Sequence, residues 1–405
     1  MKRFKNPFVQ QTLKTEKMKR SIITAVVLTL AAVSLQAQEA EVTPQPIESF
    51  VKVEYEPEWY ARQAELWHEE ALRNPSNDDA WINWFRATRY SMILASDFDS
   101  VDDEKLAAIA ETVRRQRPES YARYMLDYFC SMWTKGPHDY PDNMIKAIKM
   151  RPDNRILYPD YVVYLLKNGN QELMDDILKR WYNTGEYSYN LLNYAYNEMV
   201  GMQQNGIIFV NGDTPTYSKL LVKHGKELFP DKTVICMSLL VLPEYRSFIS
   251  SELGISPIPE PDYQDYDKWT DQAVMHIITE SKRPCYFSAV IPQLPSFQDK
   301  LYSEGLIYKY SDKRYDNLAV KKENFEKRYL LDYLYEQFTP ETYEASAYRL
   351  NLNYVPCLKS LLDYYKESGQ KQQHLKLYGM MKRIVVKAQG ISDQKRKEYN
   401  DEIDR

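Results

Sequence analysis

The chain has 405 residues, with 53 basic and 57 acidic side chains, 44% hydrophobic residues and only 12 glycines. This composition excludes a disordered or collagen-like chain. The length favours two or three domains or a repeat array over a single core, and the scarcity of glycine beside abundant Leu, Lys and Glu favours helices.

The first 37 residues have the pattern of a secretory signal peptide. A basic stretch that ends at Arg20 leads into the apolar segment 21–35 (SIITAVVLTLAAVSL), and Ala37 follows as a small residue suited to cleavage. A membrane anchor is the weaker interpretation, because a span needs about 20 apolar residues. We expect cleavage after Ala37 and translation from Met18, since residues 18–37 are a complete signal by themselves.

The charge that remains after cleavage limits the class of partner. Without residues 1–37 the chain keeps 46 basic and 56 acidic side chains. We therefore expect no nucleic-acid partner, because binding phosphate requires a basic face. No later segment is apolar enough to span a membrane, so the sequence predicts a periplasmic protein that is soluble after cleavage.

Residues 38–204 have the pattern of helical hairpins similar to tetratricopeptide (TPR) repeats. Prolines end three predicted helices, at Pro75, Pro118 and Pro152. The last two are 34 residues apart, which is the length of one such repeat, and an insertion at residues 95–103 accounts for the longer interval before them. Stacked hairpins of this kind present an extended concave face that suits a protein partner.

The predicted insertion contains a short modification pattern. Asp99, Ser100 and Val101 fit an O-glycosylation sequon that is used in some Gram-negative periplasms. A surface loop is sterically accessible to a modifying enzyme. Ser100 is therefore a candidate glycosylation site.

A small α/β domain is predicted over residues 205–320, where the period of the apolar residues changes. Strands and helices alternate there: strand 206–210, helix 216–229, strand 233–240, helix 266–281, strand 285–291 and a candidate fourth strand 306–310. Such β-α-β units have parallel strands. We therefore expect a mostly α-helical chain with a three- to four-stranded, largely parallel Rossmann-like sheet, flanked by TPR-like hairpins.

The turn after the first strand (NGDTPT) carries the best candidates for ligand binding. In open α/β sheets, ligands bind at the carboxyl ends of strands, and a glycine lets helix N-terminal amides approach a ligand. The candidate residues are Asn211, Gly212, Asp213, Thr214 and Thr216. The alternative is turn and cap formation, which these residue types perform regardless of function.

Patterns that carry catalysis, metals or nucleotides are not found. The five histidines are scattered, and the sequence has no H-E-x-x-H, G-x-S-x-G, P-loop or G-x-G-x-x-G motif. The four cysteines have no C-x-x-C spacing. We predict no catalytic residue, no metal and no cofactor, and an enzyme is the less favoured class.

Cys236 and Cys285 each lie in a predicted apolar strand. Burial as free thiols is the favoured interpretation, because free cysteine behaves as a small hydrophobic residue. Export also permits a disulfide between the two if their strands are neighbours.

An ordered set of motifs resembles a known family. The segments GIIFVNGDTPTYSKLL, KRPCYFSAV and LYSEGLIYKY follow one another between residues 206 and 310. Together they resemble the soluble C-terminal region of the DUF2723 membrane proteins, which are similar to protein O-mannosyltransferases. The multi-span membrane domain, which the resemblance implies is the glycosyltransferase part, has no counterpart in this sequence. Transfer activity therefore does not carry over.

After residue 320 the sequence returns to helical patterns. Predicted helices cover 322–338, 343–352, 355–368 and 371–388, so that C-terminal hairpins over 321–390 precede a charged tail at 391–405. Together these features favour an exported, non-catalytic scaffold that holds a protein partner in the cell envelope, accessory to a glycosylation or envelope-assembly complex. The alternative is a small-ligand or glycan-binding protein, and potentially an enzyme, with its site at residues 211–216.

Overall fold

The computed structural model describes residues 43–49, 52–95, 101–133, 141–291, 296–338 and 340–405. The predictions of a signal peptide at residues 1–37 and of glycosylation at Ser100 lie outside these residues. The described residues form two compact units: those within 43–48 and 55–143 belong to the first, and those within 49–54 and 144–405 belong to the second. The finer domain division expected from the sequence stays a prediction.

The first unit is helical. Its helices are α2 (Pro57–Arg73), α3 (Asp78–Ala95), α4 (Asp103–Gln116) and α5 (Tyr121–Trp133), and α6 (Asp142–Met150) begins at its edge. Helix α2 packs along α3, and α4 packs on α5. Pro57 begins α2 at a position where a missing N–H costs nothing, and Asp102 caps α4 by accepting a hydrogen bond from the Lys105 N–H. The assignment of these hairpins to a TPR-like repeat stays a prediction.

The second unit combines a small sheet with helices. The helices before and within the sheet region are α7 (Tyr158–Asn168), α8 (Gln171–Asn183), α9 (Tyr189–Val200), α10 (Asp213–Leu220), α11 (Pro243–Leu253) and α12 (Tyr266–Ser281). Those that follow it are α13 (Asn317–Glu323), α14 (Glu344–Asn351), α15 (Tyr354–Glu367), α16 (Lys371–Lys387) and α17 (Asp393–Asp404). None of the helices described in the chain is both long and apolar enough to cross a bilayer.

The sheet has five strands rather than the three or four expected. They are β1 (Ile207–Val210), β2 (Thr233–Cys236), β3 (Cys285–Ser288), β4 (Leu301–Ser303) and β5 (Ile307–Tyr310). Their order is β2-β1-β3-β5-β4. The pairs β1–β2 and β1–β3 are parallel, whereas β3–β5 and β4–β5 are antiparallel. The prediction of a largely parallel sheet therefore holds only for the three strands that helices connect.

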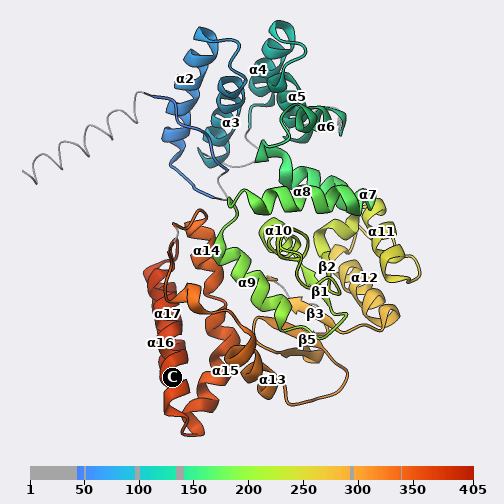
Figure 1. Cartoon of the computed structure of the whole chain (residues 1–405), viewed down its shortest axis with the longest axis vertical. Helices are drawn as coiled ribbons and strands as arrows, with labels where there is room; N and C mark the ends of the chain where they lie inside the picture. Colours follow the sequence, from blue (N-terminus) through green and yellow to red (C-terminus); the bar gives the residue numbers. More distant parts are fainter. Residues whose placement is uncertain (1–42, 50–51, 96–100, 134–140, 292–295, 339) are drawn as a thin grey trace, which may run out of the picture. The chain divides into compact units, whose positions relative to one another are not determined.

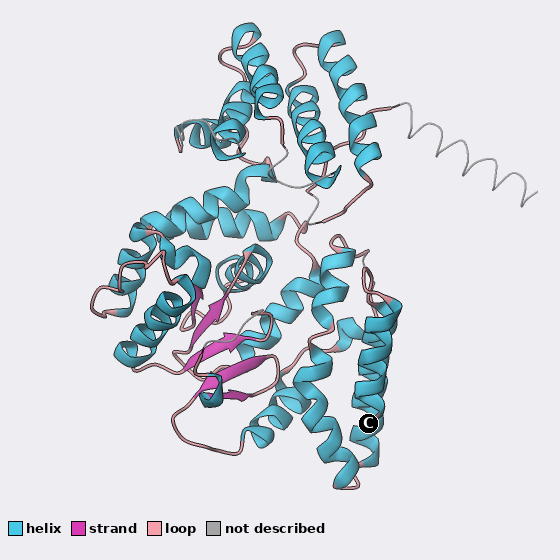
Figure 2. Cartoon of the chain, turned by 180° about the vertical axis from the view of Figure 1, so that it is seen from behind, coloured by secondary structure: helices cyan, strands magenta, loops and turns pink. Residues whose placement is uncertain are grey.

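Helices cover both faces of the parallel part of the sheet. Helices α9 and α10 lie on one side of it and α12 on the other, with the strands as one layer between them (Figures 1 and 2). Every residue of β1, β2 and β3 is buried, as expected for strands covered on both faces. The connection from β3 to β5 contains no α-helix in its described part. A parallel return normally needs such a crossover, so the chain reverses instead.

Burial of Cys236 and Cys285 as free thiols, the favoured interpretation, is confirmed, and the alternative disulfide between them does not form. Cys236 ends β2 and Cys285 begins β3, and β1 lies between these two strands. Both residues are buried free thiols. Burial raises the pKa of Cys285 to about 12, so its thiol stays protonated at neutral pH.

The predicted helix over residues 322–338 is wrong in its second half. A π-helical turn that continues α13 ends at Arg328, and Tyr329 is extended. The side chain of Asn197 binds the main chain of Leu330 twice, accepting from its N–H at 2.7 Å and donating to its carbonyl at 2.9 Å. These bonds replace the helical ones, so a contact from α9 overrides the local helix preference.

Candidate functional site

The candidate residues at the end of β1 divide into exposed and buried groups. Asn211, Gly212 and Asp213 are exposed, whereas Thr216 is buried. Gly212 has φ +82°, a conformation that favours glycine, and helix α10 begins directly after it at Asp213. The helix therefore starts three residues earlier than predicted, and Asp213 and Thr214 belong to its first turn.

Two of these candidates form contacts within the protein. The Thr216 hydroxyl donates to the Gly212 carbonyl at 2.7 Å. The carbonyl of Thr214 accepts from the hydroxyl of the buried Tyr187 at 3.2 Å. Both contacts fix the turn, which is the structural role weighed for these residue types.

Asn211 and Asp213 differ from Thr214 and Thr216 in their contacts. Neither the Asn211 nor the Asp213 side chain has a hydrogen bond or ion pair with a described residue. Desolvation raises the pKa of the Asp213 carboxyl group, and no cation offsets that effect. The end of β1 therefore presents an uncompensated carboxylate at the protein surface.

Lys219, Glu198 and Ser288 form a buried polar cluster where α10, α9 and the end of β3 meet. The Lys219 ammonium group on α10 is 2.5 Å from Glu198 Oε2 on α9, and the Ser288 hydroxyl at the end of β3 donates to Glu198 Oε1. The exposed fractions of Lys219 and Glu198 are 1% and 0%. Burial is the main cause of the raised pKa of Glu198, and Lys219 opposes it.

Whether the sheet can bind a ligand depends on which side chains lie at the carboxyl ends of its strands. In the sheet, β2 lies on one side of β1 and β3 lies on the other. The chain therefore changes direction across the sheet after β2, and the point of reversal lies between β1 and β3. Ligands of open α/β sheets bind in the crevice at that point, outside the carboxyl ends of the strands. Here Ser288 marks that end of β3, and α9 places Glu198 against it. A buried, paired carboxylate of the protein itself therefore contacts the carboxyl end of β3.

Sequence reasoning missed Glu198, Lys219 and Ser288. Each comes from a different element, and no motif joins them. The available signal was a lysine and a glutamate on the inward faces of two helices, where a charged side chain is rarely buried without a partner. Two opposite charges on such faces predict a buried ion pair.

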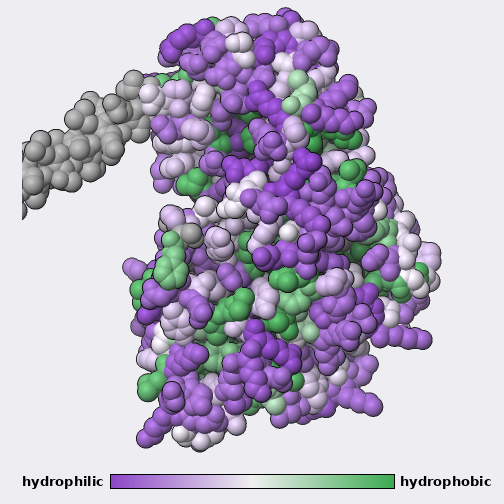
Figure 3. Space-filling model, in the orientation of Figure 1, coloured by the Kyte–Doolittle hydropathy of each residue, from purple (hydrophilic) through white to green (hydrophobic). Residues whose placement is uncertain are grey.

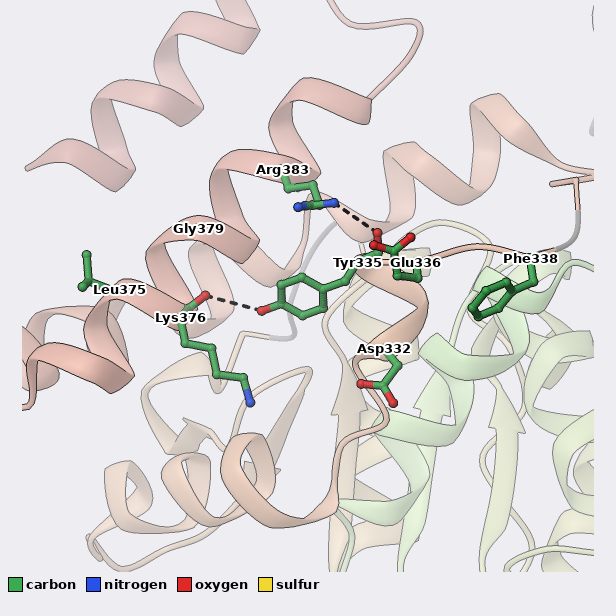
Figure 4. A pocket seen from close by; sticks show the side chains of 8 residues that line it. All are labelled: Asp332, Tyr335, Glu336, Phe338, Leu375, Lys376, Gly379 and Arg383. Atoms are coloured by element: carbon green, nitrogen blue, oxygen red, sulfur yellow. Dashed lines mark hydrogen bonds between the residues drawn. The ribbon is translucent and has the colours of Figure 1, made fainter.

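A second feature is an open groove of about 640 Å³. One wall is α16 and the other is the segment 332–338 that precedes α14 (Figure 4). Its lining residues are Asp332, Tyr335, Glu336, Phe338, Leu375, Lys376, Gly379 and Arg383. Hydrophobic side chains interrupt the hydrophilic surface over α16 and its neighbours (Figure 3).

Tyr335 joins the two walls. Its hydroxyl donates to the carbonyl of Lys376 at 3.4 Å, and Arg383 donates to the carbonyl of Tyr335 at 3.1 Å (Figure 4). The Arg383 guanidinium also lies 5.6 Å from the centre of the Tyr335 ring. These contacts hold the groove in a defined shape.

Neither the metal-binding geometry of the described residues nor the comparison with known proteins assigns a function to this chain. In the part of the chain that the structure describes, no group of three or more His, Cys, Asp or Glu side chains is arranged to hold a metal ion. The chain matches no protein-family model, no curated protein and no solved structure.

Proposed function

We propose that this chain is an exported, non-catalytic scaffold of the cell envelope that binds a protein partner. The observation that supports the proposal is the buried ion pair between Glu198 and Lys219, which Ser288 joins to the carboxyl end of β3, the end at which open α/β sheets usually bind their ligands. Both charged groups and Ser288 are sealed from solvent. A substrate has no access to them unless the packing of α9 changes.

Two further features support the scaffold and its location. The paired helices α2–α3 and α4–α5 are suited to binding a partner, as in helical repeat proteins. The resemblance of residues 206–310 to the soluble region of DUF2723 proteins favours a place beside an envelope glycosylation or assembly complex. The signal-peptide pattern at residues 1–37 favours the periplasm.

We expect Ser288→Ala to leave partner binding unchanged. The experiment is crosslinking in cells of a C-terminally tagged chain, followed by capture and mass spectrometry of the attached protein. Removing one hydroxyl leaves the Lys219–Glu198 pair in place, so the fold and any scaffold surface should persist. A reproducible envelope protein should be captured equally by wild type and variant.

Two outcomes of this experiment would contradict the proposal. Recovery of the chain alone from the wild-type cells would remove the protein partner. Loss of the partner in Ser288→Ala with an unchanged melting temperature would show that partner binding depends on the buried cluster. The second outcome would contradict a purely structural role for Ser288 and Glu198.

A second function is favoured by one observation, the uncompensated carboxylate of Asp213 at the end of β1. It is a small-ligand or glycan site at the turn 211–216. We expect any sugar that raises the melting temperature of the wild type to lose that effect in Asp213→Ala, measured against a panel of monosaccharides and sugar phosphates. A carboxylate at such an edge accepts hydrogen bonds from sugar hydroxyl groups.

Asp393→Ala is the matched control for this experiment, because Asp393 is also an exposed aspartate in the first turn of a helix. It should leave the melting shift unchanged. A shift that survives Asp213→Ala would place the ligand elsewhere, and the absence of any shift across the panel would count against a sugar site.

A further inference from the structure

Three apolar side chains near the groove are strongly exposed. Phe338 is 96% exposed, Leu375 67% and Val386 75%. Phe338 belongs to one wall of the groove and Leu375 to the other (Figure 4). Strongly exposed apolar side chains on both walls of one groove are typical of an interaction site.

Gly379 lies in the middle of the exposed face of α16. Leu375, Gly379 and Val386 are four and seven positions apart, so they share one side of the helix. A glycine inside a helix is destabilising relative to alanine, because it gives the unfolded chain more conformational freedom. A Cβ atom added here would meet no atom of the chain within 4 Å. The chain's own packing therefore gives no reason for this glycine, whereas the close approach of another helix does.

The groove carries charges of both signs on opposite walls. Lys376 and Arg383 lie on α16, and Asp332 and Glu336 lie on the facing segment. All four are exposed, and none forms an ion pair with a described residue. Arg383 also donates to the carbonyl of Tyr335 within the groove, and no carboxylate of the described chain neutralises its charge.

We propose that this groove is a self-association surface, where α16 of a second copy of the chain lies across it. The second copy's basic helix then faces the acidic wall formed by Asp332 and Glu336, and a twofold axis that runs through the groove between its two walls repeats the contact. A patch that is basic on one wall and acidic on the other is complementary to itself under this rotation. The 17 residues of α16 give a contact about 25 Å long.

Charge reversal tests this arrangement with two variants of the purified chain. One is Asp332→Lys with Glu336→Lys, and the other is Lys376→Glu with Arg383→Glu. We expect a dimeric wild type in sedimentation equilibrium and a dissociation constant weaker by roughly a hundredfold in each variant alone, because like charges then face each other. Mixing the two variants should restore the dimer, since each supplies the charges that the other needs.

The control reverses the exposed pair on α17, Lys395→Glu with Glu398→Lys, and should leave the dimer intact. A wild type that stays monomeric at all concentrations would overturn the proposal, whatever other protein is captured in cells. A dimer that persists in both groove variants would place the interface on another surface. A mixture that fails to dimerise would reject the predicted pairing of the two walls.

Discussion

Glu198→Ala should lower the free energy of unfolding by about 3–5 kcal/mol. The substitution removes the partner of Lys219, whose ammonium group is 1% exposed, and leaves a buried charge without compensation. It also removes the acceptor of the Ser288 hydroxyl. Urea unfolding followed by tryptophan fluorescence measures the change directly.

The double variant Glu198→Met with Lys219→Met separates charge burial from lost packing. Replacing a whole buried ion pair by apolar side chains of similar volume is often neutral or stabilising. We therefore expect the double variant to recover most of the stability that Glu198→Ala loses. A cost below about 1 kcal/mol for Glu198→Ala would mean that water reaches the pair, and the crevice at the end of β3 would then be open to a ligand.

The pH dependence of stability provides a second readout of the same group. Burial raises the pKa of Glu198 in the folded state, so the folded protein holds this proton to higher pH than the unfolded chain. The contribution of Glu198 is therefore fully present below its unfolded pKa and is lost as the pH rises through the folded value. Glu198→Gln should flatten the stability profile within that window.

Local patterns predicted most helices and the central strands. The boundaries of α12 match the predicted 266–281. Helix α7 ends at Asn168, and the next residue, Gly169, adopts the left-handed conformation that commonly follows a helix. Strands β1, β2 and β3 begin at or within one residue of their predicted starts. In these segments local preference and tertiary burial favour the same structure.

The edge of the sheet was less predictable. Strand β4 has only three residues, all half-buried, and forms because β5 is beside it. A pairing of this kind depends on the partner strand rather than on an apolar pattern of its own. The same limit explains the missing end of the predicted helix 322–338, where Asn197 from a distant helix binds Leu330.

The candidate site also has one part that the local sequence predicts and another part that depends on tertiary packing. Asn211, Gly212 and Asp213 lie at the exposed end of β1 because a strand-to-helix turn is encoded locally. The cluster of Glu198, Lys219 and Ser288 depends on how α9, α10 and β3 meet. The spacing of residues along the sequence does not indicate which elements pack together. The buried cluster was therefore found only in the structure.

Gly305→Ala is expected to destabilise the second unit by about 3 kcal/mol. Gly305 joins β4 to β5 with φ +110°, a conformation that side chains rarely adopt. An added Cβ atom would also overlap the hydroxyl of Tyr329, which accepts a hydrogen bond from the Leu306 N–H at 3.1 Å. Strain and overpacking therefore act together, and urea unfolding should report their combined cost.

Gly254→Ala is the matched control, because Gly254 has φ +65° and an added Cβ would meet no atom within 4 Å. It should cost only about 1 kcal/mol, the strain of the left-handed conformation alone. Tyr329→Phe removes the clashing oxygen, so Gly305→Ala should be less damaging in that background than in the wild type. Equal costs at Gly305 and Gly254 would show that the turn moves away from Tyr329 freely, and the edge strands β4 and β5 would then not be fixed by this contact.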